Sequence, residues 1–252
     1  MPEKPLVGKT TGTLPFEIYR PANEISYLKI GLYGDPGVGK TTLAATAPTP
    51  LFLNAEAGDV ALRQKDVDVI RIDSFQIMDQ VYAALKAGSL PYETIVIDSL
   101  TELHRRSMDI ILKNAGREVP HQADWGHSME MIRRLVRKFR DLNMHTIFIH
   151  GAMYREDVTN GTAEYMPHLP GKLGPEISGY YDILGFMTME RDPRTKEYVR
   201  RLRVQPTPKF KAKDRTNTLG AYVEGDDLNI TRMIELVNGP QKTAVISTEE
   251  EK

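Results

Sequence analysis

Short apolar runs and longer stretches of helical periodicity alternate along the chain from residue 28 onward. The apolar runs predict strands at 28–34, 50–54, 67–73, 93–99 and 145–151. The periodic stretches predict helices at 39–47, 75–87, 100–115 and 127–142. Strands that alternate with helices predict an α/β fold, a mostly parallel twisted sheet with helices on both faces.

Beyond residue 151 the pattern changes. A segment with several Gly and Pro residues, 151–175, predicts a long loop. Two runs follow, 182–190 and 197–206, on either side of the turn sequence RDPRTK. They predict an antiparallel strand pair at one edge of the sheet, near the C-terminus. A final helix is expected at 229–238.

The domain organisation expected from this pattern is a single core, residues 28–238. Residues 1–27 are rich in Pro, Gly and Thr without a clear period, and we expect an N-terminal arm that contacts a neighbouring subunit. Residues 239–252 are polar and predict a flexible tail.

Composition is that of an ordinary globular protein, with 40% hydrophobic and 27% charged residues. No apolar run approaches the roughly 18–20 residues that span a bilayer, and the first residues lack the apolar stretch of a secretory signal. The chain has no cysteine, which excludes disulfides and thiolate zinc sites and fits a reducing cytoplasm. The six histidines show no paired metal-ligand spacing. We therefore expect a cytoplasmic protein without a membrane partner.

Charge is distributed unevenly although the net charge is only −1. Residues 191–215 contain ten Lys or Arg against three Asp or Glu, so this segment carries +7 and the remainder −8. Its densest part is KFKAKDR, residues 209–215. A local basic segment on a neutral protein indicates a localised anionic partner.

The sequence GDPGVGKT, residues 34–41, follows a predicted strand and opens a predicted helix. It fits the phosphate-binding loop G-x-x-x-x-G-K-[ST], whose glycines let backbone N–H groups surround phosphate oxygens. Lys40 would reach the β- and γ-phosphates of ATP, and Thr41 would bind Mg²⁺. The expected nucleotide-binding residues are Gly34, Asp35, Pro36, Gly37, Val38, Gly39, Lys40, Thr41 and Thr42.

Two carboxylates follow predicted strands and complete this hypothesis. Asp98 ends the apolar run TIVID, where a second Mg²⁺ ligand is expected, although a strand-end Asp can also cap the next helix. Glu56 lies just beyond the strand 50–54, at the sheet edge where ligands of α/β proteins bind. It could polarise the attacking water, or it could be an ordinary solvated loop residue.

The order of these motifs resembles the RecA-type core of strand-exchange recombinases, over roughly residues 28–215, and most of all the short phage RecA-like ATPases of single-strand annealing and recombination. The resemblance implies a RecA-like P-loop core with Glu56 as catalytic glutamate and Asp98 as magnesium residue. It also implies that His150 is the γ-phosphate sensor at the end of the next strand. RecA itself carries Gln there, so His150 departs from the family pattern.

The resemblance further implies two loops that bind single-stranded DNA, here about 113–126 and 151–172. Aromatic planes and cations can follow a single strand without reading its sequence. The expected DNA-binding residues are Tyr154, Arg155, Tyr165 and Lys172.

Proteins of this family also place basic fingers after the last strand pair, where they reach the ATP of a neighbouring subunit. Lys213 and Arg215 match that position as catalytic residues, with Lys211 as a helper. A solvated basic strand end or a DNA-facing surface would give the same charge pattern.

These features predict an ATPase, stimulated by DNA, that binds single-stranded DNA and promotes annealing or strand exchange. We expect a head-to-tail homo-oligomer, a filament or a ring, with ATP and Mg²⁺ between subunits, in the cytoplasm of a bacterium or a phage-infected host. A single-strand binding protein is a further candidate partner. The alternatives are a nucleotide-gated RecA/KaiC-like ATPase with a protein partner, and a small helicase or motor subunit.

Overall fold

The structure is a computed structural model that describes residues 26–56, 60–157, 162–192 and 194–239. Most of the expected N-terminal arm and of the C-terminal tail lies outside the described residues. The elements are β1 Lys29–Gly34, α1 Lys40–Ala44, β2 Pro50–Asn54, η2 Val60–Leu62, β3 Asp68–Arg71, α2 Phe75–Lys86, β4 Thr94–Asp98, α3 Leu100–Asn114, α4 Gln122–Arg140, β5 His145–Asp157, β6 Thr162–Pro167, α5 Leu173–Ser178, β7 Ile183–Arg191, β8 Tyr198–Arg203, β9 Lys213–Asp214, β10 Tyr222–Glu224, η3 Gly225–Asp227 and α6 Ile230–Asn238.

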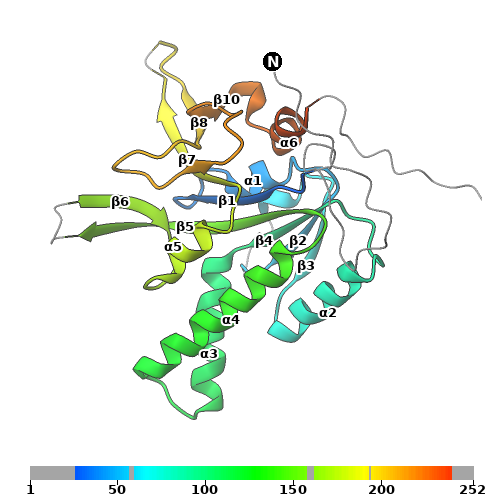
Figure 1. Cartoon of the computed structure of the whole chain (residues 1–252), viewed down its shortest axis with the longest axis vertical. Helices are drawn as coiled ribbons and strands as arrows, with labels where there is room; N and C mark the ends of the chain where they lie inside the picture. Colours follow the sequence, from blue (N-terminus) through cyan, green and yellow to red (C-terminus); the bar gives the residue numbers. More distant parts are fainter. Residues whose placement is uncertain (1–25, 57–59, 158–161, 193, 240–252) are drawn as a thin grey trace, which may run out of the picture.

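The strands form one sheet in the order β10-β8-β7-β1-β5-β4-β2-β3 (Figure 1). β1 pairs in parallel with both β5 and β7, and β4 and β2 continue the parallel part to β3. Strands β8, β9 and β10 join in antiparallel pairs at the β7 end. The predicted fold class is therefore confirmed: a mostly parallel sheet with antiparallel strands near its C-terminal end.

Two hydrophobic layers hold helices to opposite faces of the sheet. One layer packs α2, α3, α4 and α5 against Tyr33, Ile97 and Phe148. The other packs α1 and α6 against Ile30, Phe52 and Ile147. Figure 1 shows α2, α3 and α4 on one side and α1 and α6 on the other. Because successive strand residues point to opposite faces, fully buried parallel strands such as β4, with the run IVI, are apolar on both sides.

The prediction of a loop at 151–175 is wrong, because most of these residues form strands or a helix. β5 continues to Asp157 and pairs with β6 as an antiparallel hairpin, and α5 follows. Pairing satisfies backbone N–H and C=O groups that a loop would leave to water. The sequence did contain a hairpin signal, Asn160-Gly161 between two alternating runs.

The other expected DNA loop, 113–126, is helical over half of its length. α3 continues to Asn114 and α4 begins at Gln122, which leaves only a short connection. Asp124 fixes the start of α4: its carboxylate accepts the His121 backbone N–H at 2.7 Å and pairs with Arg117 at 2.9 Å. Because this contact stabilises the helix start, α4 begins at Gln122, earlier than the predicted start at residue 127. No described helix combines the length and apolar character needed to cross a membrane.

The sheet centre leads to a stability prediction. A Cβ on Gly31 of β1 would overlap the ring of the fully buried Tyr181, whereas a Cβ on Gly126 in α4 would meet nothing within 4 Å. Gly31→Ala should lower the free energy of unfolding by about 1–3 kcal/mol, because a packed core resists added volume. The control Gly126→Ala should raise it by about 0.5–1 kcal/mol, because glycine weakens a helix. Urea denaturation measures both, and an unchanged Gly31→Ala midpoint would contradict the packing.

Candidate nucleotide-binding site

The phosphate loop leaves the sheet at the carboxyl end of β1 and returns at the start of α1. Gly37 and Gly39 take φ values of 82° and 102°, a region that side chains with a Cβ rarely adopt. The glycines predicted from the motif thus have a backbone reason at these two positions.

Lys40 curls back over the loop in this structure. Its Nζ donates to the carbonyl oxygens of Gly34 at 2.9 Å and Asp35 at 2.8 Å. Burial lowers the pKa of Lys40, and the nearby carboxylates of Asp98, Glu56 and Asp35 oppose that shift. The ammonium is thus close to both carboxylates that the sequence assigned to the site.

Thr41 and Asp98 are joined directly across the site. The Thr41 hydroxyl donates to Asp98 Oδ2 at 2.7 Å, although the residues are 57 positions apart. Burial raises the pKa of Asp98 to about 6; the Thr41 hydrogen bond lowers it and Glu56 raises it. A hydroxyl and a carboxylate oxygen fit the oxygen preference of Mg²⁺. No group of three His, Asp or Glu suitable for a metal occurs among the described residues, so phosphate and water would supply the remaining ligands.

Glu56 lies where β2 ends, and its side chain is exposed. Its backbone N–H donates to Asn54 Oδ1 at 2.8 Å, and Asn54 pairs with Asp98 in the sheet. The charge of Glu56 influences the pKa values of both Asp98 and Lys40. The structure therefore brings Glu56 to the site, at the mouth rather than inside it.

Sequence reasoning missed the residue that holds the turn before Glu56. The Arg106 guanidinium, from α3, donates to the carbonyl oxygens of Ala55 and Ile72, and it lies 3.6 Å from Glu102. Arg106 is one of several basic residues on α3, so only the packing of α3 against β2 reveals this role.

The structure does not support His150 as a phosphate sensor. His150 is 0% exposed, and its Nε2 lies 2.8 Å from the Tyr181 hydroxyl. Burial lowers its pKa to about 3. It pairs with Tyr33, whereas Gly151 is the residue level with Gly34 at the loop. Since strand side chains alternate, the one-residue difference turns His150 into the core, and a glycine stands where the pairing of β5 with β1 ends.

Lys213 and Arg215 lie at the opposite end of the sheet from the phosphate loop, because β9 pairs with the first residues of β7. Lys213 Nζ donates to Ser178 O at 2.8 Å, and Arg215 Nη2 donates to Gly179 O at 2.7 Å. Burial lowers the pKa of Lys213 to about 8. Both cations thus bind the carbonyl groups at the end of α5, and neither faces the phosphate loop of its own chain.

The four expected DNA-binding residues do not share one surface. Tyr154 pairs with Tyr165, and their rings lie 5.0 Å apart on one face of the hairpin. Arg155 pairs with Glu164 on the other face, which turns toward α5, and Lys172 lies at the start of that helix. The tyrosine face instead acquires a cation that was not predicted: Lys209 Nζ lies 5.9 Å from the Tyr165 ring centroid.

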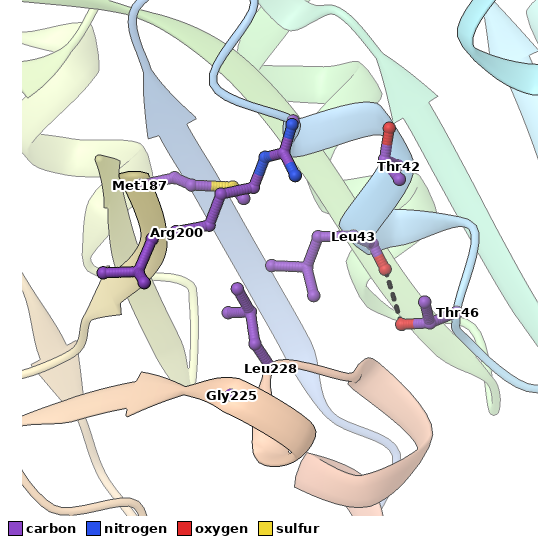
Figure 2. A pocket seen from close by; sticks show the side chains of 9 residues that line it. Thr42, Leu43, Thr46, Met187, Arg200, Gly225 and Leu228 are labelled. Atoms are coloured by element: carbon purple, nitrogen blue, oxygen red, sulfur yellow. Dashed lines mark hydrogen bonds between the residues drawn. The ribbon is translucent and has the colours of Figure 1, made fainter. Parts of the chain in front are cut away.

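Arg200 of β8 is a further residue at the phosphate loop that the sequence did not single out. Its Nε donates to the Val38 carbonyl oxygen at 3.1 Å. A Cβ on Gly39 would lie 2.9 Å from that Nε, so the side chain lies directly on the loop. Figure 2 shows the guanidinium extending from β8 toward the start of α1. The sequence identified the segment 191–215 as basic, but only the order of strands in the sheet shows that Arg200 from this segment lies at the phosphate loop.

Comparison with known proteins identifies the family of the chain. A family model described as AAA domain matches residues 26–216, and the chain belongs to this family. It is a P-loop ATPase. Among solved structures, the chain is similar to a KaiC-like protein from the hyperthermophilic archaeon Pyrococcus horikoshii OT3. The identity is 16% and the TM-score 0.41, over 70% of this chain and 77% of that one. No curated protein matches the sequence.

The burial of Asp98 predicts a pH-dependent stability. Its pKa rises from an ordinary 3.8 to about 6 on folding, so its ionisation opposes folding fully above about pH 6 and not at all below about pH 4. Asp98→Asn should therefore stabilise the nucleotide-free protein by up to about 3 kcal/mol at about pH 8. At about pH 4 it should have little effect. Denaturant titrations at both pH values measure this. Asp66→Asn, at an exposed position, is the control, and an equal gain at both pH values would refute the assignment.

Proposed function

We propose that this chain binds ATP with Mg²⁺ at residues 34–42 and hydrolyses it to ADP and phosphate. The observation that carries this proposal is the convergence of Lys40, Thr41, Asp98 and Glu56 at the carboxyl ends of β1, β4 and β2. Backbone N–H groups of the loop and the Lys40 ammonium bind the phosphates. Lys40 exchanges its two loop carbonyl partners for phosphate oxygens when nucleotide is present.

Water attacks the γ-phosphorus, and the bond from that phosphorus to the β–γ bridging oxygen breaks. Glu56 orients this water and accepts its proton; its exposed carboxylate at the mouth of the site supports that role. Thr41 and Asp98 would hold Mg²⁺, which neutralises charge on the phosphates.

Exchange of Glu56 separates binding from hydrolysis. Glu56→Gln keeps the shape of the side chain but removes the proton acceptor, so turnover should fall by about 10²-fold or more. Affinity for ATP should stay close to that of the wild type. Steady-state phosphate release and ATP titration measure the two quantities.

Glu102 of α3 offers the matched comparison, since it is a carboxylate that already pairs with Arg105 and Arg106. Glu102→Gln should leave turnover nearly unchanged. A Glu56→Gln protein that hydrolyses ATP normally would exclude Glu56 as the group that orients water.

We also propose that the ATPase binds single-stranded DNA, as the RecA resemblance of its sequence implies, for annealing or strand exchange. The tyrosine face of the β5–β6 hairpin supports this proposal. Tyr154 is 50% exposed, and Tyr165 stacks on Phe210 at 5.4 Å. Lys209 and Arg203 lie over the Phe210 ring at 5.5 and 5.3 Å. Exposed rings flanked by cations can stack bases and neutralise phosphates.

The DNA proposal predicts different effects on the two hairpin faces. Tyr154→Ala should weaken single-stranded DNA binding by about 5–100-fold, because base stacking is lost. Lys209→Ala should lower the slope of log affinity against log salt by about 0.7–1, because one phosphate contact is lost. Arg155→Ala, on the opposite face, is the control. Fluorescence anisotropy with a labelled oligonucleotide tests all three; a large effect of Arg155→Ala alone would move the binding site to the α5 face.

A head-to-tail oligomer completes the proposal, with Lys213 and Arg215 acting on the ATP of a neighbouring subunit. Their place at the far end of the sheet supports action in trans, since they cannot reach their own loop. Each would have to leave its present carbonyl partner in α5. A mixture of Lys40→Ala subunits and subunits lacking both cations should regain activity that neither shows alone.

A further inference from the structure

A pocket of about 310 Å³ opens beside the phosphate loop (Figure 2). It lies between α1, the β7–β8 pair and the turn at η3. The lining residues are Gly39, Thr42, Leu43, Thr46, Met187, Val199, Arg200, Gly225 and Leu228. Pockets of this size, about 300 Å³ and above, are typical of small-molecule sites.

The pocket is continuous with the phosphate loop. Gly39 belongs both to the loop and to the pocket wall, and so does the first turn of α1. Arg200 stands at the junction, with its Nε on the Val38 carbonyl. A molecule whose phosphates lie on the loop would therefore extend its remaining part into this pocket.

The walls are more apolar than polar, and few of the side chains on them could read a hydrogen-bonding pattern. Leu43, Met187 and Val199 supply apolar surface from α1, β7 and β8, and Leu228 supplies it from the turn before α6. The Thr46 hydroxyl is already engaged, since it donates to Leu43 O at 2.7 Å and accepts the Ile230 N–H at 2.8 Å. Among the described residues, no carboxylate or side-chain amide lines the pocket. Of the described side chains on its wall, Thr42 and Arg200 remain as those that could bond to a ligand.

We propose that this pocket receives the base and ribose of a purine nucleotide and that it discriminates little between adenine and guanine. The proposal rests on the proposed function, because the phosphates must lie on residues 34–42. Apolar contact separates similar ligands by about 10²-fold at most, whereas a site built to hydrogen-bond one of them reaches about 10⁴-fold. Affinities for ATP and GTP within about tenfold of each other are therefore expected.

Filling the pocket tests the proposal without changing the phosphate loop. Val199→Trp places a large ring in the pocket from β8, and Val69→Trp is the matched control on β3, at the opposite edge of the sheet. Calorimetric titrations with ATP, GTP and tripolyphosphate, each with Mg²⁺, separate the two parts of the site. Val199→Trp should weaken ATP and GTP binding by about tenfold or more and leave tripolyphosphate binding unchanged. Val69→Trp should match the wild type throughout.

Other outcomes overturn specific parts. If the Val199→Trp protein bound ATP with wild-type affinity, the pocket would be excluded as the site of the base and ribose. The assignment of the phosphate site would not be affected. A preference above about 10²-fold for ATP over GTP would refute weak base discrimination. A wild-type protein that binds neither tripolyphosphate nor ATP would refute the proposed function and this proposal with it. If Val199→Trp does not fold, judged by circular dichroism, Leu228→Trp fills the same pocket from the turn before α6 and carries the same expectations.

Discussion

The hydrogen bond from Thr41 to Asp98 is the interaction on which the geometry of the site depends. It joins the first turn of α1, which packs in one hydrophobic layer, to the carboxyl end of β4, whose side chains reach both layers. β5 lies between β1 and β4 and keeps their ends level. Burial of this carboxylate, which is 6% exposed, costs folding free energy. The same oxygen atoms can bind a cation, which would offset that cost.

Most cations of the basic segment 209–215 already have partners within the chain. Lys209 lies over two aromatic rings, Lys211 is 3.7 Å from Glu164, and Lys213 and Arg215 bind carbonyl groups of α5. The Tyr33 hydroxyl, from β1, lies 2.5 Å from Lys211 O and 3.0 Å from Tyr165 O. The segment therefore connects the hairpin, α5 and the strand that carries the phosphate loop. Any role in DNA binding or at a neighbouring ATP has to operate through these contacts.

Two surfaces of different chemistry flank the phosphate loop. On one side β5 runs from the level of Gly34 into the hairpin with its tyrosine face. On the other side lie Arg200 and the apolar pocket. β1 is paired with β5 and β7, so both surfaces extend from its two neighbours.

The sequence by itself determined the features that depend on neighbouring residues along the chain. Alternating strands and helices predicted the sheet, GDPGVGKT predicted the phosphate loop, and strand ends identified Asp98 and Glu56. It also predicted the strand pair near the C-terminus and the helix 229–238 close to where they are found.

Only the tertiary structure decided what each side chain meets. His150 turned inward because of one residue of register, and Arg155 and Tyr154 separated onto two faces of a hairpin. Arg106 reached the turn before Glu56 and Arg200 reached the loop, each from an element distant in sequence. Local pattern specifies backbone conformation and the alternation of side chains, but the partner across a strand depends on strand order and register, which the packing of the whole sheet selects.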